Sequence, residues 1–459
     1  MLQVGLLATA TIATVAIVAA ASTFADPDPP ANPMTFANPN GRLQTYTTAG
    51  RFDQSNPFFQ SLGTNGRACV ICHQPDAAWS VSVDGLRKRF DQSNGLDPVF
   101  RTNDGSNSPL ADVSTPAARR SAFSMLLNRG VFRIGIGVPA GADFEMVAAD
   151  DPYGYASEKE LSLFRRPLPA TNLRFLSAVM WDGRETVQPI HTPFDGGDGL
   201  IAGLRSQASD ATAGHAQASQ PLSPQQADQI VQFELSTYTA QANDGAAGAL
   251  TARSAEGGPM WLATSDYYTG INDVLGANPS GLAFDSRSMR IFEPWASRPP
   301  NSPQAAIARG EAIFNNKRID IAGVNGLNDS LGIKLIPGTC TTCHDAPNVG
   351  NHSVPLAINI GIAAASRRTP DMPLYTFRNR TSGETVQVTD PGRALITGKW
   401  KDIGKFKGPI LRGLSARAPY FHDGSAATLP DVVDFYDTRF GIGFSKQEKA
   451  DLVAFLKSL

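Results

Sequence analysis

Two stretches of the chain share one pattern, CVICH at residues 69–73 and CTTCH at residues 340–344, and together they contain all 4 cysteines. In a CxxCH motif the two thiolates add to the vinyl groups of a porphyrin, and the histidine that follows is placed to bind the iron. A zinc site would need four ligands from paired motifs, and a redox dithiol would not explain a histidine in both places. The spacing therefore predicts two covalently bound haem c groups. The residues that attach and ligate them are Cys69, Cys72, His73, Cys340, Cys343 and His344.

The composition is that of a folded, enzyme-sized protein rather than a small electron shuttle. With 459 residues, 42% of them hydrophobic, the chain is long enough to bury more than one core. Its formal net charge of -2 gives it no basic field, which argues against nucleic acid as a partner.

The N-terminal residues have the pattern of an export signal. Residues 2–24 carry no charged side chain and small residues precede Asp26, which predicts a signal peptide over residues 1–25. Because the first five residues, MLQVG, contain no Lys or Arg, an uncleaved membrane anchor is the alternative. Haem is attached to CxxCH motifs outside the cytoplasm, so the periplasm is the expected compartment in both cases.

The rest of the chain is divided by its composition. We expect a flexible lead-in over residues 26–50 and a haem domain over residues 51–205. An insertion or linker of surface loops follows over residues 206–302, and a second haem domain occupies residues 303–459. Alternating strand patterns are few and short, which predicts a mainly α fold with long loops.

Three helix starts are legible. Ser223 precedes a proline and is followed three residues later by Gln226, which is the pattern of a capping box. Ser302 precedes a proline in the same way, and Ser445 with Glu448 caps a last helix.

A repeat is present within the chain. Residues 164–168, FRRPL, lead to MWDGR at residues 180–184, and residues 406–410, FKGPI, lead to FHDGS at residues 421–425. The spacing from proline to aspartate differs by one residue between the copies, and each copy follows one CxxCH motif. The repeat predicts two homologous haem modules in tandem.

These motifs, and the run FKGPILRGLSARAPYFHDGSAATLPDVVDFY at residues 406–436 above all, strongly resemble the bacterial dihaem cytochrome c peroxidase and MauG superfamily. The resemblance covers most of residues 51–459 and leaves about 201–300 without a counterpart. It implies two tandem class I cytochrome c-like domains, of which the N-terminal one binds peroxide or oxygen and the C-terminal one relays electrons. A tryptophan lies between the haems in that family, and Trp181 matches it. The alternative for Trp181 is a buried core residue.

The resemblance also bears on the sixth ligand of the C-terminal haem. Fourteen residues after the histidine of the PYFH run, the peroxidases have a methionine and MauG has a tyrosine; here that position is Tyr436. A phenolate oxygen favours ferric iron and lowers its potential. The alternative is that Tyr436 only packs and His422 is the ligand.

The N-terminal haem departs from the peroxidase pattern. The family uses a glutamate twenty residues after the tryptophan as its distal acid/base, and that position is Ile201. The glutamine ten residues after the tryptophan is His191. His191 could move the proton, ligate the iron or lie at the surface.

Binding of calcium between the haems is open. The positions of two oxygen ligands of the family are Arg166 and Arg417, which are cations. Arg417 and Arg184 are instead candidates for pairing with haem propionates, or for surface salt bridges.

Three functions are compatible with these residues. The first is reduction of hydrogen peroxide at the His73 haem, with electrons from a small cytochrome c or cupredoxin relayed by the His344 haem. The second is oxidation of an organic or protein substrate with peroxide or dioxygen, as in MauG or the rubber oxygenases. The third is electron transfer alone, with both irons six-coordinate. A homodimer is left open.

Overall fold

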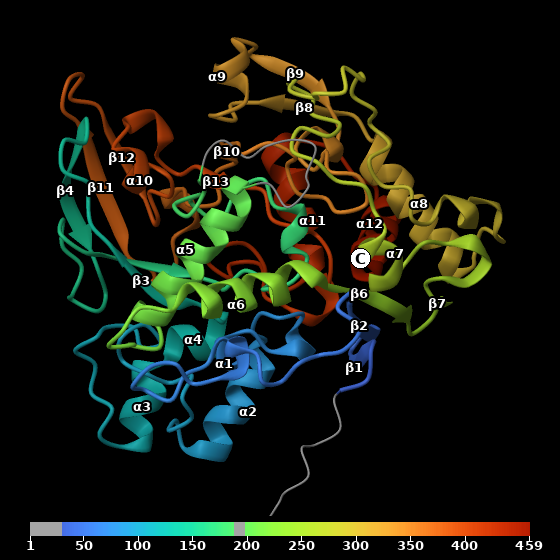
Figure 1. Ribbon diagram of the computed structural model, residues 1–459. Coiled ribbons are helices and arrows are strands. Elements are labelled where there is room, and N and C mark those ends of the chain that lie inside the picture. Colours follow the sequence, from blue (N-terminus) through green and yellow to red (C-terminus); the bar gives the residue numbers. More distant parts are fainter. Residues whose placement is uncertain (1–29, 188–197) are drawn as a thin grey trace, which may run out of the picture.

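The computed structural model describes residues 30–187 and 198–459 (Figure 1). The predicted signal peptide and His191 lie outside these residues. Within them, no helix is long and apolar enough to cross a membrane.

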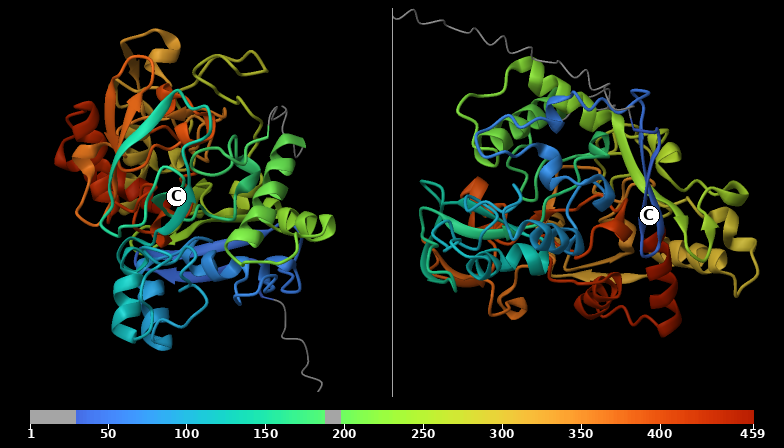
Figure 2. Two further views of the ribbon diagram at one scale, coloured as in Figure 1. Left: turned by 90° about the vertical axis from the view of Figure 1, so that its left-hand side faces the viewer. Right: turned by 90° about the horizontal axis from the view of Figure 1, so that it is seen from below.

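The N-terminal motif lies in a group of short helices at one end of the molecule (Figures 1 and 2, blue to cyan). These helices pack around a small core that includes Leu86, Phe90 and Leu126. The group consists of α1 (Cys69–Cys72), α2 (Val83–Ser93), α3 (Pro116–Ala122) and α4 (Ser124–Arg129).

Two longer helices, α5 (Asp198–Gly214) and α6 (Pro224–Ser236), follow and pack against each other. The predicted capping box of α6 is confirmed, since Ser223 Oγ accepts from the Gln226 amide and the Gln226 side chain accepts from the Ser223 amide. The expected loop after residue 205 is wrong up to Gly214, because α5 runs through that position. The alanines of α5 favour a helix, but they do not give the periodic pattern of large apolar residues from which a helix is predicted.

The C-terminal motif is surrounded by α8 (Pro303–Asn316), α11 (Leu429–Phe440) and α12 (Lys446–Ser458). The predicted caps Ser302 and Ser445 are confirmed. Helices α8 and α12 approach closely at Gly310, where a Cβ would lie 2.0 Å from the Asp451 carbonyl oxygen. The remaining helices are short: α7 (Pro259–Ala263), α9 (Asn328–Leu331) and α10 (Ala394–Thr397).

Part of the expected flexible lead-in is ordered. Residues 34–47 form β1 (Met34–Asn38) and β2 (Gly41–Thr47), which pair in an antiparallel sheet of order β1-β2-β6-β7 with β6 (Thr237–Asp244) and β7 (Gly248–Ala249). The sheet supports the first haem motif, because Trp79 Nε1 donates to Thr45 Oγ1 at 3.0 Å. The lead-in pairs with a strand about 200 residues away, which no local pattern shows.

Strands are more numerous than the sequence predicted. Beside that sheet, the described residues form a three-stranded sheet of order β12-β11-β4 and three two-stranded ones. The three-stranded sheet joins residues of the two predicted haem domains. The strands are β3 (Phe132–Ile136) with β5 (Leu161–Arg165), β8 (Ile319–Ala322) with β9 (Leu335–Gly338), β10 (Ala357–Ile358) with β13 (Phe406–Lys407), and β4 (Phe144–Asp150), β11 (Leu374–Asn379) and β12 (Thr385–Val388).

Candidate haem sites

Each CxxCH motif opens onto a cavity. The cavity at Cys69, Cys72 and His73, called here the first cavity, is also lined by α5 and α6. The cavity at residues 340–344, called here the second cavity, is also lined by α8, α11 and α12.

The two histidines that follow the cysteines are held in the same way. His73 Nδ1 lies 2.9 Å from the Trp79 carbonyl oxygen, and His344 Nδ1 lies 2.5 Å from that of Gly350. A carbonyl oxygen only accepts, so each Nδ1 carries the hydrogen and each Nε2 keeps its lone pair for a metal. Burial lowers the pKa of His73 to about 4 and lowers that of His344. Both rings are therefore neutral, as an axial ligand must be.

The cysteines lack the lowered pKa of a redox dithiol. Burial raises the pKa of Cys72 to about 11 and that of Cys69, Cys340 and Cys343 to about 12. A reactive dithiol requires a lowered pKa. The raised values argue against a redox dithiol, and buried apolar surroundings suit thioether links to a porphyrin.

The repeat has a two-fold relation in the structure. The Arg166 amide donates to the His422 carbonyl at 2.6 Å, and the Lys407 amide donates to the Trp181 carbonyl at 2.9 Å. Arg166 lies fifteen residues before Trp181, and Lys407 lies fifteen residues before His422. The two hydrogen bonds therefore join equivalent positions of the two copies. The sequence alignment on the prolines is therefore one residue out of register at this point.

The backbone repeats as well. Met180 and Phe421 both have φ of 66°, and Gly183 and Gly424 have φ of 75° and 67°. A left-handed residue other than glycine is uncommon. Its recurrence at equivalent positions shows that the two segments form the same kind of turn.

Trp181 lies between the two cavities and lines both of them. Its Nε1 donates to the Arg166 carbonyl at 2.8 Å, and its ring centroid is 6.3 Å from that of His422. The tryptophan is thus a buried core residue and, with Arg166 and Pro167, one of the described residues that line both cavities.

Both candidates for the sixth ligand, Tyr436 and His422, line the second cavity. His422 is fully buried and stacks on Phe406, and neither of its ring nitrogens has a hydrogen-bond partner among the described residues. Burial lowers its pKa. Tyr436 stacks on Phe440, and burial, with the nearby Cys343, raises its pKa.

Three cations line the second cavity: Arg166 and Lys407, which are buried, and Arg417, which is partly buried. None forms an ion pair with a carboxylate within residues 30–187 and 198–459, and Arg417 Nε lacks a hydrogen-bond partner there. Burial and the charge of Arg417 lower the pKa of Lys407 to about 7 and that of Arg166 to about 9. Several neighbouring cations in a buried site cost folding free energy unless an anion pairs with them. The haem propionates are anions that fit this cluster.

The guanidinium of Arg166 lies among carbonyl oxygens at the position where the resemblance implies a calcium ligand. Its guanidinium donates to the carbonyls of Val81 at 2.7 Å, Arg417 at 2.9 Å and Arg129 at 3.0 Å. Converging carbonyl oxygens are what a calcium ion would bind. Here the guanidinium already satisfies them.

Arg184, the other propionate candidate, lines the first cavity but is paired. Its Nη1 lies 3.0 Å from Asp182 Oδ2, and the same oxygen lies 2.5 Å from Arg165 Nη1. The pairing leaves Arg184 less free for a propionate than Arg417.

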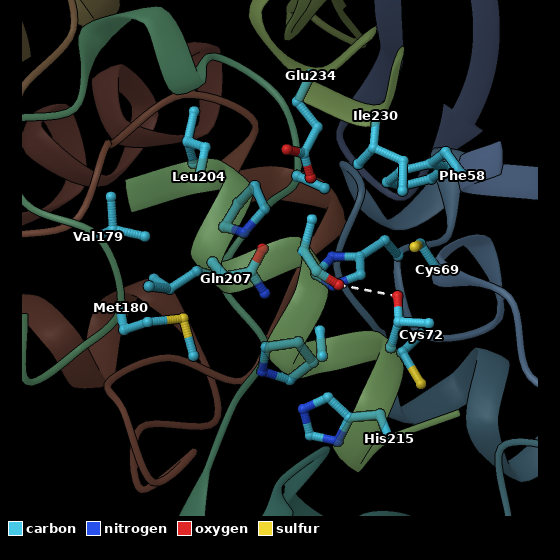
Figure 3. A pocket seen from close by; sticks show the side chains of 18 of the residues that line it. Phe58, Cys69, Cys72, Val179, Met180, Leu204, Gln207, His215, Ile230 and Glu234 are labelled. Carbon is cyan, nitrogen blue, oxygen red and sulfur yellow. Dashed lines mark hydrogen bonds between the residues drawn. The ribbon is translucent and has the colours of Figure 1, made fainter. Parts of the chain in front are cut away.

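Ile201, at the position of the family glutamate, packs in an apolar cluster on α5. Sequence reasoning missed Glu234 on α6, which lines the first cavity together with Gln207 of α5. Figure 3 shows both side chains extending into the space between the cysteines and Met180. Glu234 is 5% exposed, its Oε2 lacks a hydrogen-bond partner among the described residues, and burial raises its pKa to about 8. No motif marks this residue, since its helix lies beyond the matched segment.

A second missed group lies at the edge of the first cavity. His215 Nδ1 is 2.5 Å from Asp104 Oδ2, and Asp104 Oδ1 is 2.6 Å from Arg67 Nη1. His215 and Arg67 line the cavity. The carboxylate fixes the orientation of the imidazole at the rim.

The histidine geometry and the paired cysteines define a c-type haem protein. No family model matches the chain. It is 29% identical over 222 residues to the cytochrome-c peroxidase IdrP1 of Pseudomonas sp. (strain SCT), covering 44% of this chain and 51% of that one. It is 34% identical over 139 residues to the cytochrome c551 peroxidase of Nitrosomonas europaea, covering 29% and 35%.

Among solved structures, a variant of the diheme peroxidase BthA from Burkholderia thailandensis matches 88% of this chain and 84% of its own at 16% identity, with a TM-score of 0.32. The chain spans about half the length of IdrP1 and a third of the c551 peroxidase. The similarity to these cytochrome-c peroxidases supports the predicted resemblance to the dihaem cytochrome c peroxidase and MauG superfamily.

Proposed function

We propose that the protein is a periplasmic dihaem peroxidase that reduces hydrogen peroxide in the first cavity. A small cytochrome c or cupredoxin would supply electrons, which the second haem site would relay. The observation that carries the proposal is the shared Trp181, because it lines both cavities and the reciprocal hydrogen bonds fix the segments on either side of it. When bound, haem iron supplies the coordination position and the redox chemistry.

Reduction of peroxide consumes two electrons and two protons and releases two waters, so a side chain must deliver protons. Glu234 is suited to this work, because its pKa of about 8 keeps it protonated at neutral pH. The Gln207 amide, in the same cavity, can orient an oxygen atom by donating a hydrogen bond. His191 remains a proposed acid/base outside the described residues.

In the second cavity, His422 and Tyr436 compete for the sixth position. The unpartnered ring nitrogens of buried His422 favour its bonding to the bound haem, as ligand or as propionate partner. Arg417 would pair with a propionate through its free Nε. Both assignments rest on nitrogen atoms in the second cavity, those of His422 and Arg417, that have no hydrogen-bond partner among the described residues.

The test is peroxide-dependent oxidation of a reduced small cytochrome by the purified holoprotein, with low-temperature EPR of the oxidised and half-reduced forms. Turnover with a high-spin ferric signal in either form supports the proposal. Low-spin signals alone in both forms, without turnover, would favour electron transfer only.

The second candidate function is MauG-like oxidation of an organic or protein substrate. It is favoured by Ile201, a partly buried residue that packs against an apolar cluster at the position where the peroxidases have glutamate, and by Tyr436 in the second cavity. Peroxide consumption without oxidation of any small redox donor would move the proposal to this function.

A further inference from the structure

Three buried side chains outside the proposed chemistry converge in one place. Asp273, Asp345 and His352 are 2%, 0% and 3% exposed, and one ligand atom from each lies within 4.8 Å of the others. Asp273 belongs to the segment after α7, for which the sequence resemblance supplied no counterpart. Asp345 and His352 belong to the loop that follows the second haem motif.

The backbone holds these two segments together. The Gly270 amide donates to the Ser353 carbonyl at 2.9 Å, and the Asn272 side chain donates to the Asp345 carbonyl at 3.2 Å. The Ser353 amide donates to Asp345 Oδ1 at 2.6 Å. The three ligand atoms therefore sit on a fixed frame.

The side chains keep lone pairs that the protein does not use. The Ala277 amide donates to Asp273 Oδ2, while Oδ1 lacks a hydrogen-bond partner among the described residues. His352 Nδ1 lies 3.1 Å from Asp345 Oδ2, yet neither ring nitrogen makes a hydrogen bond within that part of the chain. Buried polar atoms without partners are rare and costly, so a ligand is indicated.

The charges point to a cation. Neither carboxylate pairs with a lysine or an arginine in residues 30–187 and 198–459, and a protonated His352 would neutralise only one of the two. Two buried carboxylates with a shared imidazole are unstable without a positive group between them.

We propose that Asp273, Asp345 and His352 bind one divalent first-row transition metal ion, of the class of Zn²⁺ or Mn²⁺. An imidazole nitrogen among the ligands disfavours Ca²⁺ and Mg²⁺, which take oxygen ligands. Bonds of about 2.1 Å to one ion keep two ligand atoms within roughly 4.2 Å, and the three ligand atoms here lie within 4.8 Å of one another, which is close to that limit.

The ion would tie the unmatched segment to the haem loop. Asp345 directly follows His344, and His352 also lines the second cavity. The metal thus acts as a structural clamp beside the second haem, distinct from its iron. The inference does not depend on peroxidase activity.

The test uses the holoprotein stripped with a chelator and then titrated with ZnCl₂. Elemental analysis counts zinc against haem iron, and thermal unfolding is followed with and without zinc. Asp273→Asn removes one ligand, and Asp266→Asn, an exposed aspartate of the same segment, is the matched control for charge. Where Asp273→Asn fails to fold, His352→Gln and Mn²⁺ EPR of the wild type replace it.

We expect one zinc per chain and a zinc-dependent rise in unfolding temperature for the wild type and Asp266→Asn. Loss of a ligand should weaken zinc binding at least roughly 10-fold, since even outer partners of metal ligands have effects of that size. Equal zinc uptake by Asp273→Asn would mean adventitious surface binding and overturn the proposal. The absence of zinc and manganese uptake by the wild type would overturn it as well.

Discussion

Glu234→Gln should lower activity and raise stability at the same time. The substitution keeps the shape of the side chain and a hydrogen-bond donor but removes the proton that the carboxyl can give. General acid catalysis contributes roughly 100-fold or more, so kcat/KM for peroxide should fall by about that factor. The wild-type rate should decline above pH 8, where Glu234 ionises, and this decline should disappear in the variant.

The effect on stability follows from the same pKa. Burial raises the pKa of Glu234 from 4.5 to about 8 in the folded protein. The unfolded chain releases this proton at lower pH, so stability is lost as pH rises from about 4.5 to about 8. At pH 7 the cost is on the order of 3 kcal/mol, because each pKa unit corresponds to about 1.4 kcal/mol. Glu234→Gln should recover much of it.

Stopped-flow peroxide kinetics from pH 5 to 9 and denaturant unfolding at pH 5 and 7 measure both effects. The control is Glu185→Gln. Glu185 is half-buried and burial also raises its pKa, but it does not line the first cavity. A variant with wild-type kcat/KM and an unchanged pH profile would refute the role of Glu234 in proton transfer. Equal stability gains at pH 5 and 7 would refute the linkage argument.

Four other variants test residues that line the two cavities. Trp181→Phe removes the hydrogen bond to the Arg166 carbonyl, and we expect slower electron transfer from the second haem to the first in stopped-flow spectra at unchanged haem content; an unchanged rate removes Trp181 from the path. Arg166→Met leaves the carbonyls of Val81, Arg129 and Arg417 without this donor. We expect it to lower the unfolding free energy by about 3 kcal/mol in denaturant titrations. The control, Arg120→Met at an exposed arginine, should change the unfolding free energy little. Tyr436→Phe and His422→Ala, compared by EPR, identify the sixth ligand, because only loss of the true ligand changes the low-spin signal of the second haem.

The sequence predicted the elements whose signals are local. The two motifs place their histidines under Trp79 and Gly350 carbonyls, and three serine caps begin helices where the pattern indicated. These features depend on a few neighbouring residues. The motif spacing alone was enough to select His73 and His344 as the candidate proximal ligands.

Features that depend on distant partners were not predictable in this way. Strands β1 and β2 are fixed by β6, and α5 by packing against α6, so their own residues carry little signal. Glu234 is recognisable only when the fold places it in the first cavity, because its raised pKa is a property of burial. The register of the repeat likewise required the hydrogen bonds of Arg166 and Lys407.

The two-fold relation of the repeat explains how one module can serve two roles. Equivalent turns present Trp181 and His422 at the boundary of the cavities. The indole Nε1 is committed to the Arg166 carbonyl, so Trp181 offers its ring to both cavities and no lone pair to a metal. His422 lines the second cavity and not the first, and its two ring nitrogens have no hydrogen-bond partner among the described residues, with Asp390 Oδ2 lying 3.8 Å from Nε2. A single exchange of side chain at equivalent positions therefore offers a candidate ligand from this turn to the second cavity and none to the first, an asymmetry that agrees with the proposed peroxide and electron-transfer sites.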